Sequence, residues 1–106
     1  MRMTPVEVIE RKPITSTLTL LGQAKQSIES ATAEALGTIP VDANGVFITV
    51  ETFPIRYWIS GTDPDATTGH LVAVGGNLFL SHRRSLDNLM MIGVGGTAVI
   101  QITYYI

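Results

Sequence analysis

Hydrophobic and polar residues alternate, one position in two, along most of this chain. The clearest case is the last segment, where one face carries Ala98, Ile100, Ile102, Tyr104 and Ile106. A period of two places successive side chains on opposite faces of a β-strand, so this segment is predicted to be a half-buried strand. Because no polar tail follows it, we expect its end to be buried, within the domain or in an interface.

The same pattern predicts further strands, separated by turns rich in Gly, Pro and Asn. In the first strand, Ile14 to Leu21, we expect Leu20 to share the face of Ile14 and Gly22 to end the run. The polar stretches 61–69 and 81–88 are predicted to be loops. The other short strands are expected at 46–51, 55–60, 70–74, 78–80 and 89–92.

Residues 23–36 fit two structures. Ala24, Ile28, Ala31 and Ala35 have helical spacing, and the segment is rich in residues that favour helices. It also fits two short strands, 27–30 and 34–38. We favour the strands, because neighbouring strands often override local propensity.

The count of seven to nine short strands predicts an all-β fold, an antiparallel β-sandwich or jelly roll. One short helix near residues 23–36 is the alternative for that segment. We expect one domain over residues 1–106, with 1–13 as a possible extended arm. The predicted core consists of Ile48, Val50, Tyr57, Ile59, Leu78, Leu80, Ile100 and Ile102.

Composition points to a protein covered by partners. Hydrophobic residues make up 45% of the chain and charged residues 15%, against about 25% charged in an average soluble chain. A domain this small cannot bury so many apolar residues alone. We expect no nucleic-acid partner, because the only basic cluster, His82-Arg83-Arg84, is typical of a solvated turn. No segment has the length of a membrane span or a signal peptide.

The residues needed for catalysis or metal binding are sparse. The chain has no cysteine, two histidines (His70 and His82) and no Gly-x-Ser-x-Gly motif. Asp63 and Asp65 resemble the start of a calcium loop, but the later ligands are missing, and Pro64 suits an Asx-type turn better. We therefore expect no enzyme activity, no metal and no cofactor.

Four aromatic residues are predicted on the outer strand faces: Phe47, Trp58, Phe79 and Tyr105. Aromatic side chains anchor protein interfaces, so these four are the candidate contacts with partners. They could instead stack on sugar rings, and Trp58 is the candidate for that role.

The C-terminal half, 55–105, resembles a group of small virion proteins of tailed bacteriophages. The resemblance rests on order and spacing, and Trp58 departs from it by standing where a charged or polar residue is expected. The matching pieces are Ile55-Arg56-Tyr57, Gly61-Thr62-Asp63-Pro64, Ala66-Thr67, Gly69-His70, Leu78-Phe79-Leu80, Leu86-Asp87-Asn88, Gly95-Gly96-Thr97-Ala98 and Tyr104.

The resemblance implies a non-enzymatic structural protein of the virion, assembled in the host cytoplasm. Its implied role is capsid decoration or cement, in which a protein binds the major capsid protein of the assembled head shell and stabilises the shell. A homo-oligomer is expected. The alternatives are a tail, neck or adaptor component, and a carbohydrate- or receptor-binding β-sandwich module.

Overall fold

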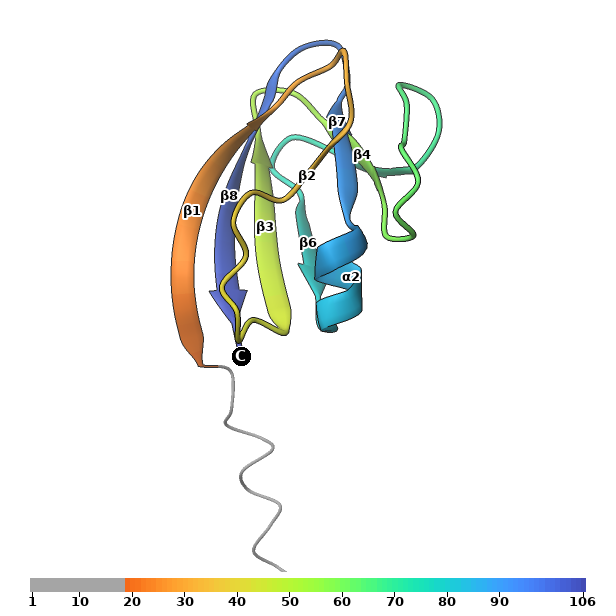
Figure 1. The fold of residues 1–106 in the computed structure, drawn as a ribbon. Coiled ribbons are helices and arrows are strands. Elements are labelled where there is room, and N and C mark those ends of the chain that lie inside the picture. The colour runs from red at the N-terminus through yellow and green to blue at the C-terminus, as the bar shows by residue number, and fades with distance from the viewer. Residues whose placement is uncertain (1–18) are drawn as a thin grey trace, which may run out of the picture.

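The computed structural model describes residues 19–106, which form eight strands and one short helix (Figure 1). The strands build two antiparallel four-stranded sheets packed face to face, so the predicted all-β sandwich is confirmed. The elements are β1 (Leu20–Ile28), β2 (Glu34–Ala35), β3 (Gly45–Glu51), β4 (Ile55–Trp58), β5 (His70–Val72), β6 (Asn77–Leu80), α2 (Arg83–Asn88), β7 (Met90–Gly93) and β8 (Ala98–Tyr105).

The strand order is that of a jelly roll. Sheet A has the order β1-β8-β3-β6 and sheet B the order β2-β7-β4-β5. The first described strand pairs with the last, the second with the seventh, the third with the sixth and the fourth with the fifth. The chain is thus a long two-stranded ribbon that has been rolled into two sheets.

The core lies between the sheets and is built by the alternating faces of the strands. Five of the eight predicted core residues are buried: Ile48, Val50, Leu78, Ile100 and Ile102. Tyr57 and Leu80 are half-buried and pack against this core.

One predicted core residue, Ile59, is not buried. Ile59 is 42% exposed, because β4 ends at Trp58 and the alternation does not continue into the next turn. Ile106, which follows β8, is 50% exposed, so the end of this segment is not buried within the domain, and its burial in an interface stays a prediction.

Within 23–36, residues 23–28 lie in β1 and Glu34–Ala35 form β2, so the helical alternative is wrong, although the strands differ in their bounds from the predicted 27–30 and 34–38. β1 continues through Gly22 instead of ending there, because residues 22–28 pair with β8. The side chain of Gln26 then ties β1 to the β2 region. The Nε2 of Gln26 donates to the carbonyl oxygen of Ala35 (2.9 Å), and its Oε1 accepts from the N–H of Gly37 (3.0 Å). The side-chain amide thus makes the two hydrogen bonds that a backbone amide of a paired strand would make. The predicted arm, 1–13, and most of the first predicted strand lie outside the described residues.

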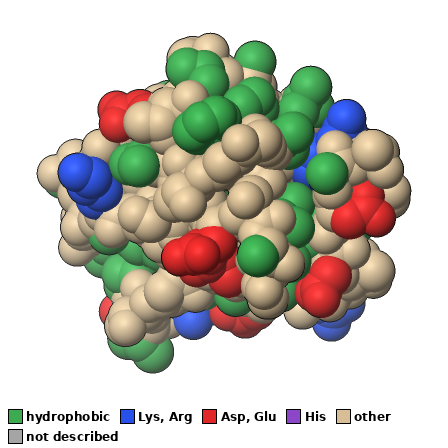
Figure 2. Space-filling view, turned by 90° about the horizontal axis from the view of Figure 1, so that it is seen from above, with side chains coloured by type: hydrophobic (Ala, Val, Ile, Leu, Met, Phe, Trp, Pro, Cys, Tyr) green, Lys and Arg blue, Asp and Glu red, His purple; other side chains and the backbone are tan. Residues whose placement is uncertain are grey.

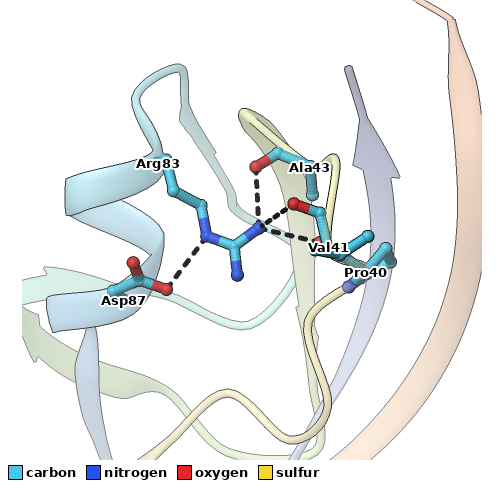
Figure 3. Close-up of polar contacts among 5 residues, drawn as sticks. All are labelled: Pro40, Val41, Ala43, Arg83 and Asp87. Carbon is cyan, nitrogen blue, oxygen red and sulfur yellow. Dashed lines mark hydrogen bonds and ion pairs between the residues drawn. The ribbon is translucent and has the colours of Figure 1, made fainter.

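The segment 81–88, predicted to be a loop, contains helix α2, and Arg83 is not a solvated turn residue. Figure 3 shows the Arg83 side chain directed at the segment between β2 and β3. Its Nη1 lies 2.8 Å from the carbonyl oxygen of Pro40, 3.0 Å from that of Val41 and 3.1 Å from that of Ala43. Its Nε donates to Asp87 (3.0 Å). Arg83 thereby links the connection between β6 and β7 to the connection between β2 and β3, at the same end of the jelly roll.

The turns β1–β2, β3–β4, β5–β6 and β7–β8 meet at the opposite end, which Figure 2 shows from above. Hydrophobic side chains reach the surface there between scattered acidic and basic groups. The backbone is tightly packed beneath them. A Cβ on Gly93 would lie 2.7 Å from the carbonyl oxygen of Ile28 and would also collide with the carbonyl oxygen of Gly96. Only glycine fits at position 93, where these backbone segments approach each other closely.

Candidate protein-interaction surface

Three of the four predicted interface residues lie together on the outer face of sheet A. Phe47 stands opposite Phe79 in the β3–β6 register. Tyr105 stands opposite Gly45 on one side and Leu20 on the other. Residues paired in this way share a face of the sheet. We call the group formed by Leu20, Phe47, Phe79 and Tyr105 the outer patch.

The outer patch is packed but open to solvent. The rings of Phe79 and Tyr105 are tilted against each other, with centroids 6.3 Å apart. Gly45 lies beneath them, and a Cβ there would be 3.7 Å from the Phe79 ring and 3.6 Å from the Cβ of Tyr105. Phe79 is 46% and Leu20 56% exposed. The aromatic rings therefore cover the glycine and present apolar surface outward.

Sequence reasoning missed Leu20, because a strict period of two assigned it to the other face with Ile14. A register shift between Leu20 and Gly22, a β-bulge, adds one residue to β1. This extra residue lets Leu21 pack against the core while Leu20 lies on the outer face. A bulge carries no strong sequence signal apart from the glycine that follows it.

The rest of the outer face of sheet A is mostly polar, with Val99 beside Glu51 as an exception. The next row in the register consists of Lys25, Gln101, Thr49 and Asn77, and Glu51 lies one row further. The outer patch is thus an apolar area at one end of a mostly polar sheet face. Such a patch, rimmed by polar residues, is typical of a protein-binding surface.

Trp58, the fourth predicted residue, lies on sheet B and is separate from the outer patch. Its ring meets the His70 imidazole edge to face, with centroids 5.3 Å apart. His70 also contacts Tyr57, with ring centroids 5.2 Å apart. These three side chains lie at the base of the polar segment 59–69 that joins β4 to β5.

Segment 59–69 is held in place by its own polar contacts. Arg56 donates to the carbonyl of Ala66 through Nε (3.0 Å) and to that of Gly69 through Nη1 (2.8 Å). Asp65 accepts from the N–H and the hydroxyl of Thr67, at 2.9 and 3.2 Å. These bonds, led by the Thr67 N–H, lower the pKa of the Asp65 carboxyl. Asp65 therefore makes the predicted Asx-type turn.

Residues 19–106 contain no pocket and no cluster of three potential metal ligands. Within the same range, none of the hydrogen bonds involves an imidazole of His70 or His82. No helix in this part of the chain has the length and apolarity needed to cross a membrane.

Comparison of the chain with family models, with curated proteins and with solved structures returned no match. The geometry described above is therefore the basis for a functional proposal.

Proposed function

We propose that this protein is a non-enzymatic structural protein of a tailed-phage particle, a capsid decoration or cement protein that binds the assembled head shell. The observation that carries the proposal is the outer patch: a packed, solvent-exposed aromatic area on a jelly roll whose described residues form no pocket. The phage-like succession of motifs over 55–105 supports the same role.

The fold agrees with this role. Double-sheet jelly rolls are common in viral capsid proteins and in lectins, although a fold by itself does not define a function. A cement protein acts by binding the assembled shell in preference to free subunits, which stabilises the shell through mass action. That task needs an adhesive surface and no catalytic group.

Co-sedimentation of the purified chain with expanded head shells from its phage tests the proposal. We expect wild-type protein to sediment with the shells. Phe79→Ser, which removes a ring of the outer patch, should weaken binding at least about tenfold. The matched control is Leu71→Ser, on β5 of sheet B, where Leu71 is 54% exposed.

Two results would count against these ideas in different ways. Wild-type protein that stays in the supernatant at all concentrations rejects the decoration role. Equal losses of binding in Phe79→Ser and Leu71→Ser would retain shell binding but reject the outer patch as the contact. A copy number of a dozen or fewer per particle would favour a neck or tail position.

The aromatic group on sheet B favours a second candidate, a carbohydrate- or receptor-binding module. Trp58 lies beside His70 at the base of the ordered segment 59–69, and an indole ring is a suitable surface for stacking a sugar. A glycan array with wild type and Trp58→Ala tests this function. Binding that is lost in the variant supports it, and an array without signal rejects it.

A further inference from the structure

We propose that two copies of this chain pair through the outer edges of their β1 strands, so that their two A sheets join into one antiparallel eight-stranded sheet. This inference concerns contacts between copies. It stands whether or not the protein binds a phage shell.

The first observation is the unusual length of this edge. The other three edge strands, β6, β2 and β5, have four, two and three residues, whereas β1 has nine. Natural sheets protect their edges chiefly by keeping edge strands short or by covering them. In Figure 1, β1 forms the margin of sheet A, and no described segment lies beyond it.

The hydrogen-bond pattern identifies which backbone groups of β1 point away from β8. The N–H of Ile106 donates to Thr19, and the carbonyl of Tyr105 accepts from Asn44 near β3. Backbone N–H and C=O groups point alternately to the two sides of a strand. The groups that point from β8 toward β1 are therefore those of Ala98, Ile100, Ile102 and Tyr104. Their partners in β1 are Gly22, Ala24, Gln26 and Ile28. The backbone groups of Gln23, Lys25 and Ser27 therefore point out from the edge.

Among two-fold pairings centred near the middle of β1, at Ala24, Lys25 or Gln26, the side chains favour one register. A two-fold axis at Lys25 would place two ammonium groups directly opposite each other, which is unfavourable. An axis at Gln26 would bring together the two 35–37 segments that the Gln26 amides hold. An axis at Ala24 avoids both problems. It places Lys25 opposite the Gln23 amide of the partner copy and Gln26 opposite the partner's Gly22, where even an added Cβ would have no neighbouring atom within 4 Å.

In this register, the backbone of Gln23 in each copy exchanges hydrogen bonds with the backbone of Lys25 in the other copy. The two Ala24 residues form a non-hydrogen-bonded pair on the axis, where Cα atoms are about 4.5 Å apart. This spacing lies within the range that a disulfide can bridge, about 4.4–6.8 Å.

Cysteine cross-linking of the full chain tests the register directly, because the natural sequence contains no cysteine. Ala24→Cys should form a covalent dimer under mild oxidation, and Ser27→Cys, whose two copies would lie far apart, should not. If Ala24→Cys does not cross-link, the proposal is overturned. This holds whatever keeps the two β1 edges apart, including coverage by residues 1–18 of the same chain. Equal cross-linking of both variants overturns it as well.

The dissociation constant of the dimer gives a second measurement that does not need cysteine. Gln23 is exposed on the outer face of sheet A, so its substitution should leave the fold intact. Gln23→Glu places a carboxylate opposite Lys25 in both symmetric pairs and should tighten the dimer about threefold to tenfold at low salt. Gln23→Lys should weaken it by a similar factor. A monomer at all concentrations in light scattering, or equal effects of the two substitutions, overturns the inference.

Discussion

The guanidinium of Arg83 is predicted to stabilise the fold through backbone carbonyls and hardly at all through its ion pair. Arg83→Met keeps an apolar stem of similar length but removes the group that meets the carbonyls of Pro40, Val41 and Ala43. Ala43 itself is fully buried. Losing hydrogen bonds from a charged donor, and leaving part-buried acceptors without a partner, should lower the free energy of unfolding by about 2–3 kcal/mol.

The control is Asp87→Asn, which removes the ion pair and leaves the carbonyl contacts. The two side chains of this pair are 35% and 52% exposed, and an exposed pair four residues apart on a helix is worth about 0.5 kcal/mol or less. The two substitutions therefore separate the two roles of Arg83.

Urea unfolding measures both variants, with fluorescence of the single tryptophan, Trp58, as the probe. For a domain of this size, 2–3 kcal/mol corresponds to a fall in melting temperature of about 10–20 °C. The reasoning is refuted if Arg83→Met costs less than about 1 kcal/mol, or if Asp87→Asn costs as much as Arg83→Met.

Three further predictions concern the core, two glycines in strands and the dependence of stability on pH. Ile100→Ala should cost about 2–5 kcal/mol of unfolding free energy in urea, whereas Ile59→Ala should change it by less than about 0.5 kcal/mol; equal costs would contradict the burial of these residues. Gly93→Ala should cost about 1–3 kcal/mol or more by calorimetry, because its methyl group meets backbone, and Gly22→Ala, with free space around it, should be nearly neutral. Burial raises the pKa of Tyr104 above the usual 10.0, so its contribution is complete below pH 10 and is lost as the pH rises through the folded-state pKa. Unfolding between pH 8 and 12 should show a steeper loss of stability for wild type than for Tyr104→Phe, and parallel curves would contradict this.

The sequence predicted the parts of the fold that depend on a period of two. The buried faces of β3 and β8 follow from alternation alone, because each strand has one face toward the core and one toward solvent. Helix α2 was missed because six residues are too few to show a helical period, although Leu86 and Leu89 have the i, i+3 spacing of one apolar turn. Arg83 could not be assigned to its carbonyls, since those lie about forty positions earlier in the chain.

The candidate surface was predictable in its residues but not in its arrangement. Alternation placed Phe47, Phe79 and Tyr105 outward, and the register brought them together on three different strands of sheet A. Nothing in the sequence pairs β3 with β6, so the separation of Trp58 from the other three aromatics depends on topology alone. The contribution of Leu20 depends on a bulge.

The position of β8 determines when the molecule can fold. It lies between β1 and β3 and is the last described strand to leave the ribosome. Until it arrives, β1 and β3 lack the neighbour that separates them, and a nascent chain exposes both of their inner edges. Such long-range closure is slow, on the order of milliseconds to seconds. Sheet A is therefore completed only after β8 has been synthesised, and products that stop before Ala98 lack this inner strand and should be cleared by proteases instead of accumulating as folded fragments.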